Sequence, residues 1–157
     1  AFGSLSGEIE LSSVRDRYLG YLNALHDGEL KENYHLIQQI GQSKEDYLDE
    51  VVNRIIEEKI TGIVLENDVL AIQLINHLNQ VKLDIPEKVA IVGFDNIQAS
   101  SLIQPSLTTI EQNFVEIGKV ACRIVLEQIE TGNQPAKHEK TDVKLIIRNS
   151  SCLKERK

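Results

Sequence analysis

Short apolar runs alternate with amphipathic stretches along the whole chain. The apolar runs have the length of buried strands, and the amphipathic stretches carry apolar residues three and four positions apart, the spacing of one helix face. The predicted strands are residues 1–5, 34–40, 61–65, 88–94, 107–110 and 143–147. The predicted helices cover about 12–27, a stretch after Ser43 that runs through Ile56, about 68–80, and 114–131. This alternation predicts an α/β fold with a doubly wound, mainly parallel sheet flanked by helices.

Residues 88–94, with the sequence KVAIVGF, form the most hydrophobic of the predicted strands. A run without polar alternation is typical of a strand at the centre of a parallel sheet. We therefore expect helices to cover this strand on both faces.

The size of the chain fits one globular domain or slightly less. It has 157 residues, of which 41% are hydrophobic and 26% charged. It lacks Met and begins at Ala1 with a strand-like apolar stretch. We interpret this beginning as the edge of a piece of a longer protein, with an expression artefact as the alternative.

The charge of the chain argues against a DNA-binding surface of its own. The net charge is −7, and the one Lys/Arg cluster is the terminal 154–157. A self-sufficient DNA-binding module usually has a basic face. The two cysteines, Cys122 and Cys152, do not have the spacing of a zinc site and predict a reduced, cytoplasmic protein. No apolar run is long enough for a membrane span.

Sequence signatures of catalysis are missing. The chain has no G-x-S-x-G, no G-x-x-x-x-G-K-[ST] and no G-x-G-x-x-G motif. The histidines are scattered and unpaired in sequence: His26, His35, His77 and His138. The prediction is a protein that is not an enzyme and that needs no cofactor or metal.

Polar side chains follow three of the predicted strands. Asn67-Asp68 come after the strand that ends at Leu65, Asp95-Asn96 after Phe94, and Glu111-Gln112-Asn113 after Ile110. In open α/β sheets small ligands bind at the carboxyl ends of the strands. Amide and carboxylate groups suit a ligand rich in hydroxyls. The alternatives are local, because Asn67 or Asp68 could cap a helix and Asp95 could form an Asx turn.

Several motifs, in order along the chain, carry a resemblance to a known family. They are R-x-x-G-Y at Arg17 to Tyr21, N-D-x-x-A at Asn67 to Ala71, I-P-E-x-V-A-I-V-G-F-D-N at Ile85 to Asn96, P-x-L-T-T-I at Pro105 to Ile110, and L-I-I-R-N-S within Lys144 to Ser150. Together they resemble the C-terminal half of the effector-binding core of lactose/galactose-type transcriptional repressors. The resemblance covers essentially the whole chain.

The resemblance implies a fold like that of periplasmic sugar-binding proteins, with two α/β lobes around a cleft. Residues 1–113 would form the C-terminal lobe, residues 114–132 would supply a helix to the N-terminal lobe, and residues 133–157 would return and end in a tail. The DNA-binding helix-turn-helix head and most of the N-terminal lobe would lie outside this chain. The apolar face of the 114–131 helix would then be exposed unless something covers it.

The family's effector contacts map to four positions of this sequence: Arg17, Asn67, Asp95 and Gln112. Arg17, on its own a surface residue, would hold the polar edge of the effector. Asp95 would accept hydrogen bonds from sugar hydroxyls. Glu66 departs from the family, in which small residues are common at that position.

The resemblance also implies partners and a mechanism. The effector is a small molecule, by default a sugar, and its binding would shift the equilibrium between lobe arrangements and so change operator affinity. A homodimer is expected, with candidate interface residues Leu74, Leu78, Leu102 and Ile103, although core packing competes as the role of Leu74 and Leu78. The main rival is a solute-binding receptor of a sugar transporter.

Overall fold

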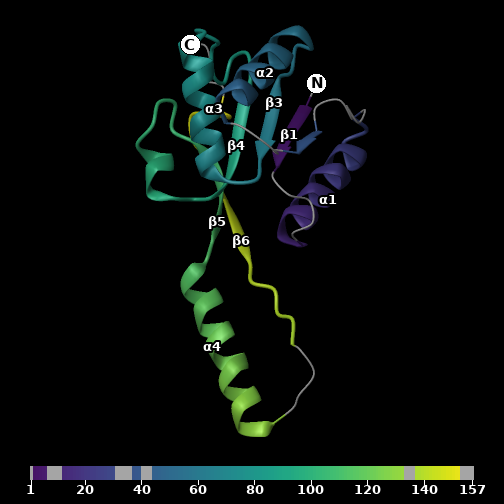
Figure 1. Ribbon diagram of the computed structural model, residues 1–157, viewed down its shortest axis with the longest axis vertical. Helices are drawn as coiled ribbons and strands as arrows, with labels where there is room; N and C mark the ends of the chain where they lie inside the picture. The colour runs from purple at the N-terminus through teal and green to yellow at the C-terminus, as the bar shows by residue number, and fades with distance from the viewer. Residues whose placement is uncertain (1, 7–11, 31–36, 40–43, 133–136, 153–157) are drawn as a thin grey trace.

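The computed structural model describes residues 2–6, 12–30, 37–39, 44–132 and 137–152. Figure 1 shows a body of helices around a sheet, from which a long helix and the strands that join it to the body extend. The elements in chain order are β1 (Phe2–Ser6), α1 (Ser12–Asp27), β2 (Ile37–Gln39), α2 (Lys44–Glu57), β3 (Gly62–Leu65), α3 (Asp68–Gln80), β4 (Ala90–Asp95), the 3-10 turn η2 (Gln98–Ser101), β5 (Thr108–Gln112), α4 (Phe114–Thr131) and β6 (Val143–Ile146).

The strands form a single sheet in the order β2-β1-β3-β4-β5-β6. Neighbouring strands are parallel except for β5 and β6, which pair antiparallel. The α/β class and the mainly parallel sheet are therefore confirmed. The strand predicted at 34–40 corresponds to β2, and the rest of that range lies outside the described residues, as does Ala1.

The core lies between the sheet and the helices α2 and α3. The amphipathic pattern of α3 places its apolar positions on one face, and this face is buried against β3 and β4. The core side chains include Val51, Val52 and Ile55 of α2, Leu70, Leu74, Ile75 and Leu78 of α3, and Ile63, Leu65, Ile91 and Leu107 of the strands.

The opposite face of the sheet is less covered than the sequence predicts. Ile91 and Gly93 of β4 are buried, whereas Val92 and Phe94, which alternate with them, are only half-buried. Val64 of β3 is 42% exposed. The prediction that 88–94 is covered on both faces is thus wrong for this chain, because fully buried and partly exposed side chains alternate along the strand.

The helix α1 lies beside β1 and packs through Val14 and Leu25 (Figure 1). Tyr21, on the same helix, is half-buried. Burial raises the pKa of its hydroxyl, and the nearby phenol of Tyr18 raises it further. The N-terminal half of α1 lies near the lower end of the sheet in Figure 1.

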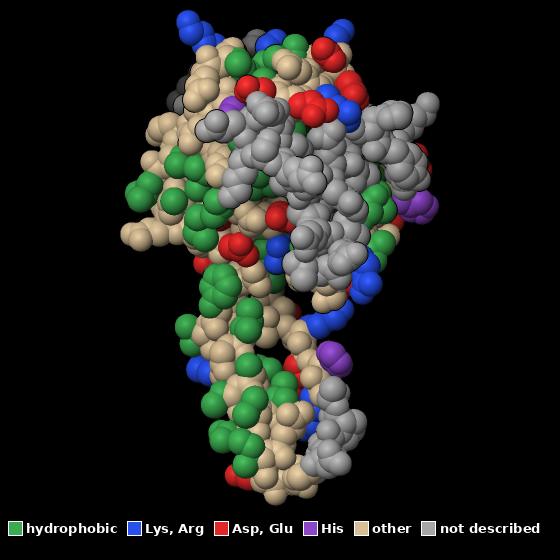
Figure 2. Space-filling view, in the orientation of Figure 1, with side chains coloured by type: hydrophobic (Ala, Val, Ile, Leu, Met, Phe, Trp, Pro, Cys, Tyr) green, Lys and Arg blue, Asp and Glu red, His purple; other side chains and the backbone are tan. Residues whose placement is uncertain are grey.

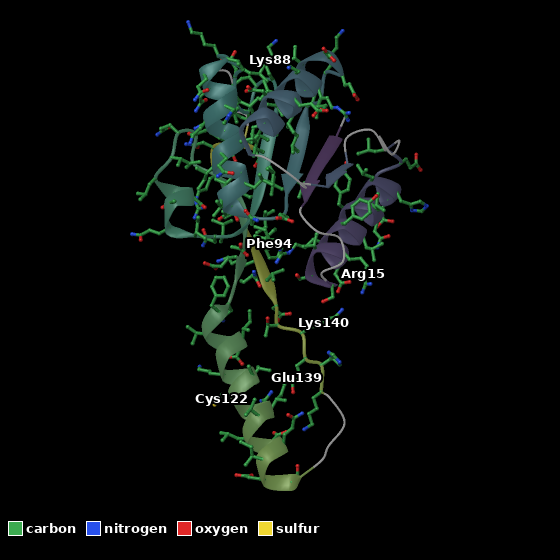
Figure 3. The ribbon with its side chains drawn as sticks, in the orientation of Figure 1. Arg15, Lys88, Phe94, Cys122, Glu139 and Lys140 are labelled. Atoms are coloured by element: carbon green, nitrogen blue, oxygen red, sulfur yellow. The ribbon has the colours of Figure 1, made fainter. Side chains whose placement is uncertain are left out.

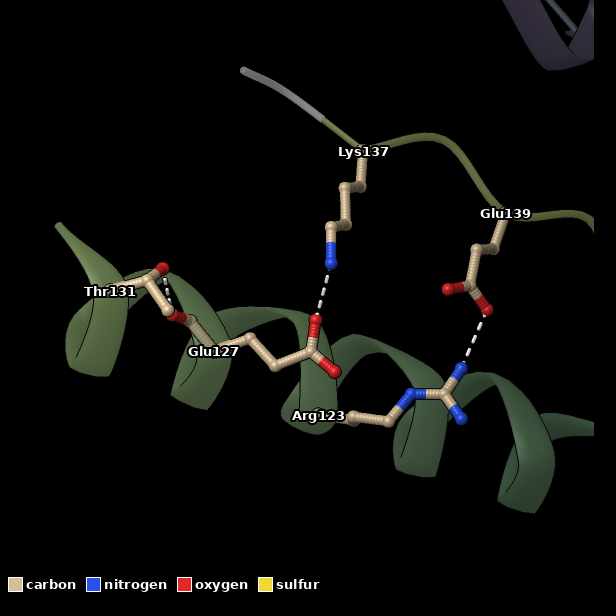
Figure 4. Close-up of polar contacts among 5 residues, drawn as sticks. All are labelled: Arg123, Glu127, Thr131, Lys137 and Glu139. Carbon is tan, nitrogen blue, oxygen red and sulfur yellow. Dashed lines mark hydrogen bonds and ion pairs between the residues drawn. The ribbon is translucent and has the colours of Figure 1, made fainter. Parts of the chain in front are cut away.

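The strands β5 and β6 run out of the body together, and α4 continues from β5 away from it (Figure 1). Side-chain contacts hold the returning segment against α4 (Figure 4). Arg123 Nη2 donates to Glu139 Oε2 at 2.7 Å, and Lys137 Nζ donates to Glu127 Oε2. The hydrogen bond and charge of Lys137 lower the pKa of the Glu127 carboxyl.

No residue of α4 is buried. Figure 2 shows hydrophobic side chains gathered along this helix. The exposed apolar residues of the extension are Phe114, Val115, Val125, Leu126 and Ile129 of α4, and Val143, Leu145 and Ile147 of the return. Among the described residues, no helix combines the length and the apolar character needed to cross a membrane.

Candidate functional site

The carboxyl ends of β3, β4 and β5 meet at one edge of the sheet, because the three strands are parallel neighbours. Asn67 follows β3, Asp95 ends β4 and Gln112 ends β5. Figure 3 shows Phe94 at the end of the body from which β5 and β6 leave, with Arg15 of α1 at the same end. Three of the four predicted effector positions therefore lie on adjacent strand ends, which we call the strand-end edge.

Arg17, the fourth predicted position, reaches this edge from α1. Its Nη1 donates to the backbone oxygen of Glu66 at 2.7 Å. Its Cζ lies 3.9 Å from the centroid of the Phe94 ring, which is a cation–π contact. The guanidinium is thus fixed by β3 and β4 together, with N–H groups left over that have no partner among the described residues.

Asp95 is held at the end of β4 by a neighbour across the sheet. Gln112 Nε2 donates to Asp95 Oδ1 at 2.6 Å, and both side chains are half-buried. The other carboxylate oxygen accepts no hydrogen bond from any residue that the structure describes. Asp95 therefore presents an acceptor that no described residue uses, in an orientation fixed by Gln112.

Asn67 caps α3, as the local alternative predicts. Its Oδ1 accepts the backbone N–H of Leu70 at 2.9 Å, and its φ of −152° is that of extended backbone. Its Nδ2 donates to Glu66 Oε1 at 3.1 Å. Both functional groups of this amide are therefore engaged within the chain.

Asn67→Ala is expected to lower the free energy of unfolding by about 1 kcal/mol, because the first turn of α3 loses its side-chain acceptor. Asn67→Ser is the matched control, since serine also caps helices well and should cost less than about 0.5 kcal/mol. Urea denaturation followed by circular dichroism measures both. A loss for Asn67→Ala no larger than that for Asn67→Ser, with both below about 0.5 kcal/mol, would contradict a stabilising cap.

Asp68 forms a buried hydrogen-bond centre that the sequence analysis did not identify. Its side chain is fully buried. Oδ1 accepts from Thr109 Oγ1 at 2.5 Å, and Oδ2 accepts from Ser100 Oγ at 2.6 Å and from the backbone N–H of Ile97 at 3.0 Å. The N-D motif marks the position, but no sequence signal identifies partners 29 to 41 residues away.

A second group of contacts surrounds Asn96, next to Asp95. Its Nδ2 donates to Glu111 Oε1 at 2.7 Å, and its Oδ1 accepts from Arg148 Nη2 at 2.7 Å. Its backbone N–H donates to Thr109 Oγ1 at 3.3 Å. Arg148 was not among the predicted site residues, although it belongs to the L-I-I-R-N-S motif.

Among the residues that the structure describes, acidic side chains outnumber basic ones at the strand-end edge. Glu66, Asp95 and Glu111 supply three carboxylates, whereas Arg17 and Arg148 supply two guanidinium groups. The guanidinium of Arg148 already donates hydrogen bonds to Leu107 O and to Asn96 Oδ1. The arrangement favours a neutral hydrogen-bonding ligand over an anion.

A groove of about 540 Å³ continues from this edge along the junction of β5, α4 and β6. Its lining includes Glu111 and Gln112 of β5 and, from the returning segment, Asp142 and Lys144. Gln112 therefore faces both the Asp95 contact and this groove. Among the described residues, no group of three His, Cys, Asp or Glu side chains is placed to hold a metal ion.

Two of the four predicted interface residues are corrected by the structure. Leu74 and Leu78 have no exposed surface, because the inner face of α3 lies on the core. A side chain without exposed surface cannot contact a second copy, so both are core residues. Leu102 is 74% exposed and Ile103 packs against the edge of the core, and these two keep their place as predictions.

Comparison with known proteins identifies the family of the chain. Residues 2–151 match the periplasmic binding protein-like domain family. The transcriptional repressor PurR of Haemophilus influenzae is 33% identical over 153 residues, which are 94% of this chain and 45% of that protein. The transcriptional regulator RegA of Clostridium acetobutylicum is 37% identical over 130 residues, 83% of this chain and 39% of that protein. The chain spans less than half the length of these curated relatives.

Among solved structures, a sugar-binding transcriptional regulator of Escherichia coli, determined with phosphate, has a TM-score of 0.76 to this chain. The two are 26% identical, and the match covers 95% of this chain and 54% of the other.

Proposed function

The chain belongs to the periplasmic binding protein-like domain family and is of the lactose/galactose-repressor type, and we propose that its strand-end edge binds a small, hydroxyl-rich effector. Binding at this edge then changes the DNA affinity of the protein that carries the chain. The observation that carries the proposal is the Asp95 carboxylate, fixed by Gln112 through one oxygen and available through the other.

The ligand class follows from the donors and acceptors at this edge. A sugar hydroxyl donates to the free oxygen of Asp95, and neighbouring hydroxyl oxygens accept from the unused N–H groups of Arg17. The exposed part of the Phe94 ring offers an apolar face to the ligand. Because carboxylates outnumber guanidinium groups here, a neutral sugar fits this half of the site better than its phosphate ester.

The extension supports a two-lobe arrangement. Residues 1–113 form one lobe, α4 within residues 114–132 packs into a second lobe, and residues 133–157 return. The exposed apolar face of α4 is what such a second lobe would bury. The ligand then lies between the lobes, and its preference for one arrangement shifts their equilibrium.

DNA binding belongs to a part of the protein outside this chain, since the chain has a net charge of −7. The protein acts in the cytoplasm as a homodimer, with Leu102 and Ile103 as interface candidates. A transport receptor is the weaker reading, because the PurR and RegA relatives are transcriptional regulators.

Asp95→Ala in the full-length protein is expected to leave DNA binding intact and to abolish its response to the effector. Operator DNA is first selected from random oligonucleotides, and affinity is measured by fluorescence anisotropy with and without D-ribose, D-glucose or D-galactose. An effective sugar should change the affinity of the unmodified protein by about 5- to 150-fold, the usual range of allosteric coupling.

Asp84→Ala is the matched control, because Asp84 is an exposed carboxylate on the loop before β4. It should respond to the sugar as the unmodified protein does. A normal response of Asp95→Ala would remove Asp95 from the site. A sugar response absent from all three proteins would contradict the proposed effector class.

A further inference from the structure

Arg148 lies two residues after the end of β6, and its side chain crosses to β5 and to the loop after β4. Nη1 donates to the backbone oxygen of Leu107 at 2.7 Å, and Nη2 donates to Asn96 Oδ1 at 2.7 Å. The side chain is half-buried. Each contact uses a different terminal nitrogen of the planar guanidinium, whereas lysine has a single terminal nitrogen and cannot keep the same geometry.

The segment that carries Arg148 is itself fixed to the sheet. The backbone N–H of Arg148 donates to Thr108 Oγ1 at 2.8 Å. Ser150, fully buried, accepts from the backbone N–H of Thr108 and donates to the backbone oxygen of Ile91 at 2.6 Å. The backbone at Arg148 is therefore held in place by the sheet. The hydrogen bond from its guanidinium to Asn96 consequently restricts the position of Asn96.

The residue that Arg148 contacts has an unfavourable backbone conformation. Asn96 has a φ of +53°, and Asp95 before it has a φ of +110°. Neither residue is glycine, and such conformations cost of order 1–3 kcal/mol unless the surroundings hold them. The contacts of Asn96 with Arg148, Glu111 and Thr109 hold this turn from three sides.

We propose that Arg148 is a positioning residue for the effector site, acting through Asn96 to aim the Asp95 carboxylate. The backbone of Asp95 is continuous with that of Asn96, so a fixed Asn96 sets the direction in which Asp95 leaves β4. Gln112, one residue beyond the register partner of Asp95 on β5, then donates to Asp95 Oδ1. Because Arg148 lies two residues after β6, the same contact links the end of the returning strand to the turn at Asp95 and Asn96.

The proposal rests on the proposed function for the identity of the ligand, but its geometric part needs no ligand to be tested. Two signals report on the turn in the free chain. The amides of Asn96 and Ile97 are hydrogen-bonded to Thr109 and Asp68, so their hydrogen exchange is slowed. The side-chain amide resonance of Gln112 reports on its bond to Asp95.

The experiment compares Arg148→Lys with the unmodified chain by NMR hydrogen exchange and by side-chain amide spectra. Exchange at Asn96 and Ile97 is expected to accelerate at least tenfold, and the Gln112 side-chain signal to shift. The amides of Ile60 and Leu83, bonded to the backbone oxygens of Ile55 and Leu78 away from the turn, should change less than twofold. A merely structural role would accelerate all four amides together and would not move the Gln112 signal selectively.

Asn96→Gly provides the second variant, since glycine keeps the positive φ but removes the side chain that Arg148 contacts. In this background Arg148→Lys should cause no further shift of the Gln112 signal. An equal shift with and without the Asn96 side chain, or unchanged exchange at Asn96 and Ile97, overturns the proposal.

Binding of the effective sugar, titrated separately, distinguishes this proposal from the proposed function. Arg148→Lys should weaken it about tenfold while Asp84→Ala leaves it unchanged. If the exchange results hold and sugar affinity is unaffected, Arg148 orders the turn without serving a ligand site, which overturns its role for the effector. If the sugar binds but hydrogen exchange at Asn96 and Ile97 is unchanged in Arg148→Lys, the positioning role is overturned and the proposed function stands.

Discussion

Asp68→Ala is expected to lower the free energy of unfolding by about 3–5 kcal/mol. The side chain is fully buried and accepts hydrogen bonds from Thr109, Ser100 and the backbone N–H of Ile97. Removing the acceptor leaves the buried hydroxyls of Ser100 and Thr109 and the half-buried N–H of Ile97 without this partner, and opens a cavity beside them. Hydrogen bonds to a carboxylate contribute about 1.5–3 kcal/mol each, and their sum is reduced because the donors share one acceptor group.

Urea denaturation gives the loss as a lower midpoint at an unchanged slope. Asp84→Ala is again the control, because an exposed carboxylate on a loop should change stability by no more than about 0.5 kcal/mol. The loss of unfolding free energy for Asp68→Asn should lie between those for Asp84→Ala and Asp68→Ala, since the amide keeps the side-chain volume and one acceptor oxygen. A loss below about 1 kcal/mol for Asp68→Ala would refute the hydrogen-bond centre.

Gly93→Ala is expected to lower the free energy of unfolding by about 3 kcal/mol, at the upper end of the usual range for overpacking. A Cβ at this position would lie 2.3 Å from Asp68 Oδ1 and 3.0 Å from Leu107 Cδ2. The carboxylate would have to move away from β4, and its hydrogen bond with Thr109 would be strained or lost. The glycine is therefore required by the close approach of α3 to β4.

Gly118→Ala is the matched control in the middle of α4, where an added Cβ meets nothing within 4 Å. It should raise the free energy of unfolding by about 0.5–1 kcal/mol, because alanine favours helix. The double variant Asp68→Ala with Gly93→Ala should lose less unfolding free energy than the two single variants together. Both substitutions disturb the hydrogen bond between Asp68 and Thr109. Strict additivity would contradict that shared contact.

Much of the fold could be predicted because its signals are local. The apolar periodicity identified the helices from α1 to α4, and the runs around β3 and β4 identified the central strands. The strand ends could be placed on one edge because parallel neighbours share direction. The positions of Asn67, Asp95 and Gln112 follow from that rule alone.

The rest depends on contacts between residues distant in sequence. The apolar spacing along α3 is the same for a helix that faces a core and for one that faces a partner chain. Periodicity alone therefore could not decide whether Leu74 and Leu78 are core or interface residues, and their burial shows that they are core residues. Arg148 meets Asn96 across 52 residues, and nothing in L-I-I-R-N-S specifies that partner. The positive φ at Asp95 is also invisible in sequence, because it is imposed by the surrounding contacts.

The most direct test of the central claim, a hydroxyl-binding site at the strand-end edge, is isothermal titration of the full-length protein with D-ribose, D-glucose and D-galactose. Inorganic phosphate and the phosphate esters of the same sugars complete the panel. We expect at least one neutral sugar to bind, its binding to be lost in Asp95→Ala and retained in Asp84→Ala, and the anions to bind more weakly. Binding that survives Asp95→Ala, a preference for the anions, or no sugar binding at all would contradict the account.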